Sequence, residues 1–347
     1  MSTLAVVSQS GQTLNFFHLA SGKRTGQLRD LTAEPHELCY DQRTGLLYIS
    51  HAYEHGWYPA HGTFGTKISV VDSMQRKVVE MIDVSPAKGT HYLVLDSKRD
   101  ILYASVEDGV GCGPNAGGIV GICLKTRKVI KAIRSGHKTH WFVMTPDGAK
   151  AYTCNKEAGF VSVIDLVNER MVGRIDMPGG CEQPGISGNG ELAYFPSPTI
   201  GGSRSGAGFA IQVIDTTTDR MVQSISLDLG AVTVHVDSED RLLVGQYRIG
   251  FSAGSTKPVP LYGGLLLLAS AREGYRELGR LETGVVPLTI FASPDGQRAF
   301  VSNIFLGTVT VVDLSTMTVE RTLQVDTESR ADKGLHQGAH GLALIRE

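Results

Sequence analysis

Four histidines occupy the same position in four copies of a repeated segment, at His36, His91, His140 and His340. Imidazoles that meet from separate rigid elements are typical metal ligands, and neutral imidazole suits Zn, Fe, Mn, Ni or Cu better than a hard cation. Three or four such ligands leave room for water or substrate, as in catalytic sites. The pattern predicts a divalent transition metal here; the alternative is that the four side chains hydrogen-bond water and loop carbonyls in a polar channel.

Five further polar residues are candidates for catalysis. Glu182 stands at the same position of the next copy and could be a ligand, an acceptor for an imidazole N–H, or a general base. His137 and His336 lie just before two of the predicted ligands, where they reach the site or lie in solvent. Tyr247 and Arg248 could hold an anionic group on the side of the ring without metal ligands; the alternative is that they are simply solvated.

The repeat that carries these residues predicts the fold. Its seven copies begin at His36, His91, His140, Glu182, Val232, Leu288 and His340. They are 42 to 56 residues apart, close to the spacing of roughly 40 to 50 residues expected for four-stranded propeller blades. The third copy illustrates the order, with strands expected at 140–145, 149–155, 160–166 and 170–175, separated by turn residues. We therefore expect an all-β, seven-bladed β-propeller with little helix, forming a single domain over residues 1–347.

The two ends of the chain are expected to complete one blade together. The last copy supplies only an inner strand at 340–345, whereas residues 4–8, 13–19 and 23–28 read as three strands without an inner one. Pairing one C-terminal strand with three N-terminal strands would close the ring and remove open sheet edges.

This arrangement would bring the candidate residues to one face. The first residue of each inner strand lies at the channel mouth, and the four histidines fall on the neighbouring blades seven, one, two and three, with Glu182 next on blade four. Long insertions between second and third strands, at 52–66, 107–118, 198–208 and 248–263, lie on the same face. Long loops in a compact domain are often functional, so we expect a walled cup over the channel.

The strands also resemble those of a known family. The second strands contain Tyr48-Ile49-Ser50-His51, Tyr152-Thr153-Cys154-Asn155 and Phe300-Val301-Ser302-Asn303, and the third strands include Phe160-Val161-Ser162-Val163-Ile164-Asp165. This pattern resembles the YVTN family of seven-bladed propellers, which is similar to the lactonase-type and streptogramin-lyase-type propellers. The resemblance implies the propeller fold over nearly the whole chain and, for activity, ring opening, ring closing or elimination.

Together these features predict a metal-dependent enzyme that acts on a small organic molecule at the channel mouth. The expected chemistry is that of a lyase, a cyclising or isomerising enzyme, or a lactonase-type hydrolase, with the metal as Lewis acid. One alternative is iron-dependent, oxygenase-like chemistry at a four-histidine site. Another is a non-catalytic propeller that serves as a scaffold for protein partners.

Composition excludes several other classes. The 33 basic and 35 acidic residues give a net charge of -2, which offers no excess positive charge for nucleic acid. The longest apolar run, at 264–269, is far shorter than the roughly 20 residues that span a bilayer, and no secretory signal is evident. Five cysteines without a CxxC motif indicate neither a disulfide framework nor a thiolate zinc site. We expect a cytoplasmic protein with a small-molecule substrate and no nucleic-acid or membrane partner; the sequence does not specify its oligomeric state.

Overall fold

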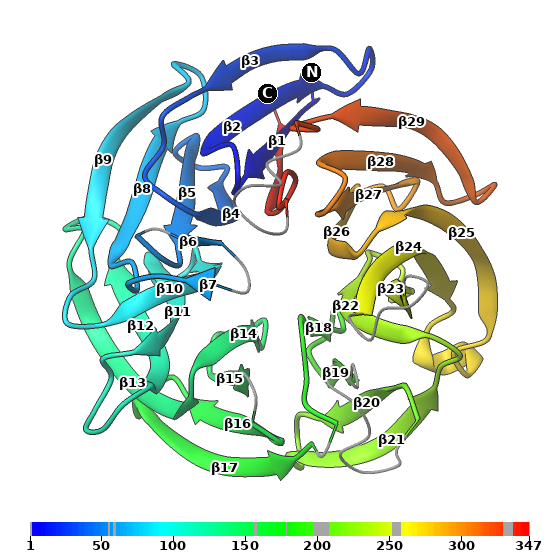
Figure 1. The fold of residues 1–347 in the computed structure, drawn as a ribbon. Helices are drawn as coiled ribbons and strands as arrows, with labels where there is room; N and C mark the ends of the chain where they lie inside the picture. The colour runs from blue at the N-terminus through cyan, green and yellow to red at the C-terminus, as the bar shows by residue number, and fades with distance from the viewer. Residues whose placement is uncertain are drawn as a thin grey trace.

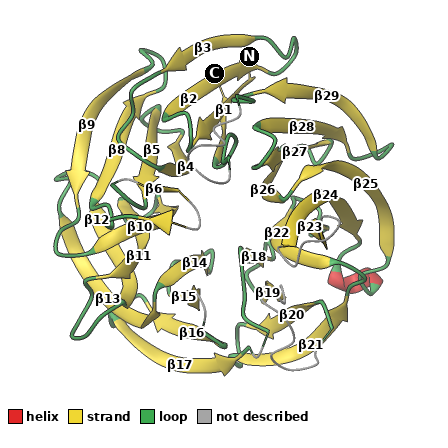
Figure 2. Cartoon of the chain, viewed as in Figure 1, coloured by secondary structure: helices red, strands yellow, loops and turns green. Residues whose placement is uncertain are grey.

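The structure is a computed structural model that describes residues 2–54, 56–57, 60–155, 158–177, 179–197, 208–251, 258–328 and 336–346. The described residues form seven four-stranded antiparallel sheets, arranged as a ring around a central channel (Figure 1). Regular structure in these residues is almost entirely strand, and the single helix is the 3-10 helix η1 (Ala271–Glu273) (Figure 2). The predicted all-β, seven-bladed propeller is confirmed. No helix in the described part of the chain is long and apolar enough to cross a membrane.

The strands of each blade run in order from the channel outward, and blade one is the blade that contains His36. Blades one to three consist of β4 (Pro35–Asp41), β5 (Leu46–His51), β8 (Lys67–Asp72) and β9 (Lys77–Asp83); β10 (Lys88–Asp96), β11 (Ile101–Asp108), β12 (Ala116–Cys123) and β13 (Val129–His137); and β14 (Thr139–Met144), β15 (Lys150–Asn155), β16 (Phe160–Asp165) and β17 (Arg170–Asp176). Blades four to six consist of β18 (Gly185–Ile186), β19 (Leu192–Ser197), β20 (Ala210–Asp215) and β21 (Arg220–Ser226); β22 (Gly230–Val236), β23 (Leu242–Phe251), β24 (Pro258–Leu268) and β25 (Glu277–Val285); and β26 (Pro287–Ala292), β27 (Arg298–Asn303), β28 (Thr308–Asp313) and β29 (Thr318–Gln324). A separate short hairpin contains β6 (Gly56–Trp57) and β7 (Ala60–His61).

Blade seven is made from both ends of the chain. Its order is β30 (Leu342–Arg346), β1 (Ser2–Ser8), β2 (Thr13–His18) and β3 (Arg24–Leu28). Strand β30 pairs antiparallel with β1, where Leu4 lies opposite Leu344. The two termini therefore lie side by side at the edge of the ring (Figure 1).

An aspartate at the end of the third strand fixes the turn to the fourth in four blades. Asp165 shows the arrangement, because its Oδ1 accepts hydrogen bonds from the backbone N–H groups of Val167 and Asn168, at 3.0 and 2.8 Å. The same pair of bonds is made by Asp72, Asp215 and Asp313. Aspartate commonly nucleates turns by bonding to the backbone two and three residues ahead, so these residues explain the regular strand spacing.

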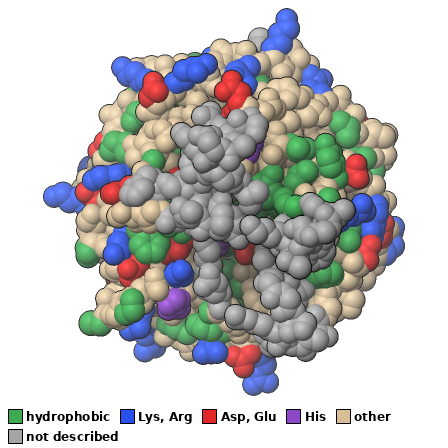
Figure 3. Space-filling model, in the orientation of Figure 1, with side chains coloured by type: hydrophobic (Ala, Val, Ile, Leu, Met, Phe, Trp, Pro, Cys, Tyr) green, Lys and Arg blue, Asp and Glu red, His purple; other side chains and the backbone are tan. Residues whose placement is uncertain are grey.

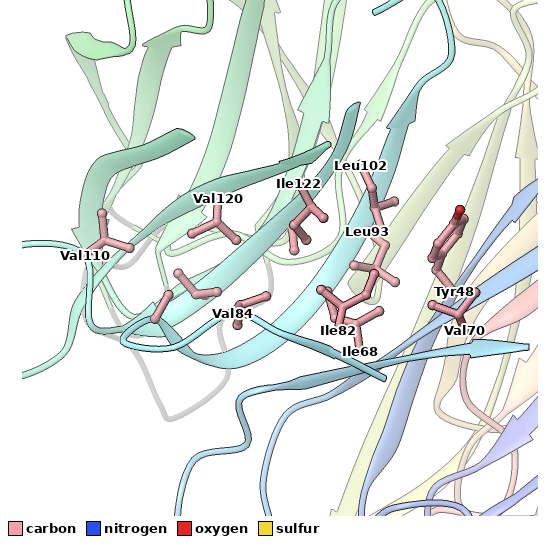
Figure 4. Close-up of a cluster of buried hydrophobic side chains, with 13 residues drawn as sticks. Tyr48, Ile68, Val70, Ile82, Val84, Leu93, Leu102, Val110, Val120 and Ile122 are labelled. Atoms are coloured by element: carbon pink, nitrogen blue, oxygen red, sulfur yellow. The ribbon is translucent and has the colours of Figure 1, made fainter. Parts of the chain in front are cut away.

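The hydrophobic core lies between the blades. In the cluster between blades one and two, Ile68 and Val70 of β8 and Ile82 of β9 pack with Leu102 of β11 and Ile122 of β12 (Figure 4). Blade-to-blade packing buries both faces of the inner three strands and leaves the outermost ones largely exposed. Because the core does not depend on the channel, the channel-lining residues can be polar without loss of this packing.

Two histidines outside the predicted ligand set, His51, which is buried, and His235, which is partly buried, predict an acid-sensitive stability. Burial lowers the pKa of His51 and of His235 to about 4 each. An unfolded histidine has a pKa near 6.5, so between pH 6.5 and 4 the unfolded state binds more protons and the folded state loses stability as pH falls. We expect the unfolding free energy, measured by urea denaturation with chelator present, to fall by about 2 kcal/mol per histidine between pH 7 and 4.5.

The variant His235→Gln tests this prediction. Glutamine does not titrate. The difference in unfolding free energy between pH 7 and pH 4.5 should therefore be smaller in the variant by about 2 kcal/mol. An unchanged difference would contradict the assignment of this acid sensitivity to the His235 imidazole.

Candidate functional site

The inner strands are interrupted where they reach the channel mouth. In blades one, two and three the antiparallel register shifts between Pro35 and Leu38, between Thr90 and Leu93, and between Thr139 and Phe142. The residues skipped by the ladder are the pairs His36-Glu37, His91-Tyr92 and His140-Trp141. Such bulges redirect side chains and often lie next to active sites. Each bulge here falls on a predicted ligand and on the residue that follows it.

Buried hydroxyls on the second strands join neighbouring bulges. Ser50 accepts a hydrogen bond from the backbone N–H of Glu37 at 3.0 Å and donates one to the carbonyl of His91 in the next blade. Ser105 does the same one blade further on, between Tyr92 and His140. Each serine therefore accepts a backbone N–H that the bulge leaves outside the ladder, and it also holds the backbone carbonyl of the histidine in the next blade.

The side chains of three predicted ligands converge. Nε2 of His36 lies 2.6 Å from Nε2 of His91, and the ring centroids of His91 and His140 are 3.6 Å apart. Each of the three histidines offers a nitrogen, and these nitrogens all lie within 4.8 Å of one another. His36 and His91 are 6% and 2% exposed, so the group lies below the protein surface. We refer to these three residues as the histidine cluster.

The fourth predicted ligand, His340, lies beside the cluster and pairs with a carboxylate. Its ring centroid is 4.1 Å from that of His36, and its Nδ1 lies 2.8 Å from Oε1 of Glu37. Thr289 donates a further hydrogen bond to the same oxygen, at 3.4 Å. Glu37, which is 2% exposed, was not among the residues predicted from the sequence. Its position directly after a predicted ligand was the available signal, because a bulge can turn two consecutive side chains inward.

A second layer of polar side chains follows the cluster along the inner strands. Thr233 of blade five donates a hydrogen bond to Oε1 of Gln183 of blade four, at 3.0 Å. Tyr92 of blade two hydrogen-bonds to Gln183, and burial together with the charge of Glu37 raises the pKa of the Tyr92 phenol above its usual value. These contacts link blades two, four and five.

Glu182 and Tyr247 flank the cluster on the side of blades four and five. Oε2 of Glu182 lies 3.7 Å from Nδ1 of His140, and the carboxylate side chain is 25% exposed. Burial and the negative charge of Glu182 raise the pKa of Tyr247 to about 12, so this phenol stays protonated at neutral pH. A Cβ on Gly230 would lie only 2.4 Å from the Tyr247 ring, and glycine there makes room for it. A carboxylate that can accept a proton and a phenol that can donate a hydrogen bond therefore lie near each other.

The described contacts do not bring the other three candidates to the cluster. His137 is exposed at the end of β13, and Nε2 of His336 lies 2.6 Å from the backbone carbonyl of Asp326. Arg248 is exposed and lines a small groove on blade five together with Gln246 and Arg280. Catalytic roles for these residues remain predictions.

Parts of the predicted insertions, at residues 55, 58–59, 198–207 and 252–257, lie outside the described residues. On blade five the described flanks continue the blade as a hairpin, because β23 and β24 stay paired from Arg248 opposite Leu261 to Phe251 opposite Pro258. This wall of the expected cup is thus an extension of the sheet.

The histidine cluster fits a divalent transition metal. Two imidazole nitrogens bound to one tetrahedral ion at about 2.0 to 2.1 Å lie about 3.3 Å apart. The pair His36 and His91 would therefore need to open by less than about 1 Å from its present hydrogen-bonded distance of 2.6 Å. A donor set of three nitrogens favours a transition metal over magnesium or calcium, which prefer oxygen ligands.

The serine bridges give a prediction about metal affinity. Ser105→Ala removes the hydroxyl that accepts a hydrogen bond from the Tyr92 N–H and donates one to the His140 carbonyl. We expect the unfolding free energy to fall by about 1 to 3 kcal/mol. We also expect metal affinity, measured by competition with a chromophoric chelator, to fall about tenfold, because outer-shell partners orient ligands.

Ser302→Ala is the matched control. Ser302 accepts the N–H of Thr289 at 2.9 Å in blade six, where the corresponding channel residue is Leu288 rather than histidine. It should lose similar stability and keep its metal affinity. Equal losses of affinity in both variants would show that the serine bridge has no specific effect on the cluster.

Comparison with known proteins supports the fold and leaves the function open. No family model and no curated protein sequence matches the chain, so the YVTN resemblance is supported only in its architecture. A periplasmic gluconolactonase from Pseudomonas aeruginosa is similar with a TM-score of 0.71 and 16% identity, over 100% of this chain and 99% of that one. A putative 6-phosphogluconolactonase from Bacteroides fragilis has a TM-score of 0.68 and 12% identity, over 99% and 98% of the two chains. Hydrazine synthase of Kuenenia stuttgartiensis has a TM-score of 0.68 and 14% identity, over 90% of this chain and 95% of that chain. At these identities the similarity establishes a shared fold alone.

Proposed function

We propose that this protein is a metal-dependent hydrolase that opens a small lactone at the channel mouth. The observation that carries the proposal is the convergence of three imidazoles, two buried and one partly exposed, beside a carboxylate, with Glu182 3.7 Å from His140. The structural similarity to proteins described as a gluconolactonase and a putative 6-phosphogluconolactonase favours lactone hydrolysis among the predicted reactions. A shared fold does not determine a reaction, so the site chemistry must support it independently.

The residues of the site have distinct roles in this reaction. His36, His91 and His140 hold the metal, which when bound supplies Lewis-acid polarisation of the lactone carbonyl and lowers the pKa of water. Glu182 accepts a proton from the water that attacks the carbonyl carbon. The ring C–O bond then breaks, and the leaving oxygen takes up a proton to give a hydroxy acid. Tyr247 donates a hydrogen bond to the oxygen that develops negative charge.

Lactone hydrolysis by metal-depleted and metal-loaded protein tests the proposal. Protein purified with chelator should be inactive on simple δ-lactones such as δ-valerolactone, as measured by proton release. Addition of Zn, Mn, Fe, Ni or Cu should restore activity with about one ion per chain by elemental analysis. Hydrolysis that is equal with and without metal, or absent with every metal, would contradict the proposal. Metal uptake without hydrolysis would instead favour the lyase, isomerase or oxygenase alternatives.

A further inference from the structure

The seven residues at the channel mouth divide into a polar arc and an apolar arc. The polar arc runs through blades seven, one, two, three and four and contains His340, His36, His91, His140 and Glu182. The apolar arc, on blades five and six, contains Val232 and Leu288. Each of these two residues directly follows a paired residue at a register shift, as His36, His91 and His140 do. The strand geometry therefore places them at the same level as the cluster.

The two apolar side chains do not belong to the packing between blades. Among the described residues, neither Val232 nor Leu288 is part of an interblade hydrophobic cluster, although Val234, two residues along β22, is. Val232 is 4% exposed, close to the 6% of His36, and Leu288 is partly exposed. Their position at the bulges and their absence from these clusters indicate that they face the channel opposite the metal ligands.

Exposed apolar side chains also lie on the β23–β24 hairpin of the same blade five. Ile249, Leu261 and Tyr262, on β23 and β24, are 47%, 45% and 50% exposed. On the face shown in Figure 3, hydrophobic side chains gather over blades five and six, whereas acidic and basic side chains are intermixed around the rim. A Cβ on Gly263, next to Tyr262, would lie 3.1 Å from the side chain of Pro287, the residue before Leu288. The hairpin therefore lies close to the start of β26.

The polar groups nearby do not suit a sugar phosphate. None of the seven channel-mouth residues is lysine or arginine. Of the two arginines in the groove of blade five, Arg280 is already paired with Asp228 at 2.6 Å and with Glu277 at 2.7 Å, and the described contacts do not bring Arg248 to the histidine cluster. The hydroxyls of a sugar facing Val232 and Leu288 would lose water without gaining hydrogen-bond partners, which is costly.

We propose, on the premise of the lactonase function above, that the substrate is a lactone with an alkyl or other apolar substituent. The lactone carbonyl faces the histidine cluster, the substituent lies against Val232 and Leu288, and its end leaves the site along the β23–β24 hairpin. Phosphorylated and polyhydroxylated sugar lactones are poor substrates.

A graded series of δ-lactones tests the preference. The series runs from δ-valerolactone through δ-hexalactone and δ-octalactone to δ-decalactone, with gluconolactone and 6-phosphogluconolactone for comparison. We expect kcat/KM to rise about three- to fourfold for each of the first added methylenes that become buried. Sugar lactones that are hydrolysed as well as δ-decalactone would overturn the proposal.

A pair of isosteric variants locates the effect. Val232→Thr replaces a channel-facing methyl by a hydroxyl and should reduce the preference for δ-decalactone over δ-valerolactone about tenfold. Val234→Thr makes the same change in the interblade core, where Val234 is 2% exposed, and should lower stability while leaving the preference unchanged. An unchanged preference in Val232→Thr would contradict the placement of the substituent.

Binding measurements separate this proposal from the proposed activity. If no lactone is hydrolysed, the lactonase function fails, and calorimetry with δ-lactams, which resist hydrolysis, still measures the preference. Tighter binding of an alkyl lactam than of a gluconolactam by metal-loaded protein, weakened in Val232→Thr, would support the apolar subsite. Equal binding, or no binding of either, would overturn it.

Discussion

Replacement of His91 by alanine is expected to reduce bound metal from about one ion per chain to less than about a tenth, and the metal-dependent rate by on the order of a thousandfold. His91 is the middle member of the cluster, with its ring centroid 4.0 Å from that of His36 and 3.6 Å from that of His140. Its loss leaves two nitrogens on blades that are not adjacent. Elemental analysis and rates at saturating lactone would measure the two effects.

His18→Ala is the control for removal of an imidazole. His18 lies on the surface, where its Nδ1 is 2.8 Å from Oγ of Ser21, and the variant should keep both metal and activity. Circular dichroism and urea denaturation would establish that the His91 variant still folds. A folded His91→Ala protein that binds one metal ion with unchanged affinity would remove His91 from the ligand set.

Glu182→Gln is expected to lower kcat by about 10²- to 10⁴-fold while metal content stays near that of the original protein. Glutamine preserves the shape of the side chain 3.7 Å from His140 but cannot accept a proton from water. A loss of kcat with metal content retained distinguishes a general base from a residue that only supports the cluster.

Glu191→Gln provides the matched control on the same blade. Glu191 is exposed and accepts a hydrogen bond from the side-chain amide of Asn189 at 2.7 Å. It has no role in the proposed site, so kcat should not change. Loss of metal in Glu182→Gln together with loss of activity would contradict the general-base role and make Glu182 a ligand.

The repeat was sufficient to predict the blades, because it records alternating apolar residues and turns. It did not predict how the inner strands bulge, since a bulge depends on which backbone groups pair across the ladder. In blade four an inner strand was expected from Glu182 onward, whereas only Gly185–Ile186 pairs as strand. Gln183 instead bonds to the backbone of Val232 in blade five, a contact between blades that no single repeat specifies.

The same limit applies to the site. Aligning one position per repeat identified His36, His91 and His140, because these residues share one strand position. It gave His340 the same role and passed over Glu37, although the structure places these two 2.8 Å apart. Their partnership joins blades seven and one across more than 300 positions of the chain, which a local pattern cannot record.

The pairing of β30 with β1 has a consequence for synthesis. His36 emerges from the ribosome early, yet the imidazole that rests against it belongs to His340, just ahead of the strand that closes blade seven. A nascent polypeptide therefore lacks both the inner strand of blade seven and the support for His36 until residues 340–346 have been synthesised. Deletion of β30 should leave an open ring prone to association with other copies.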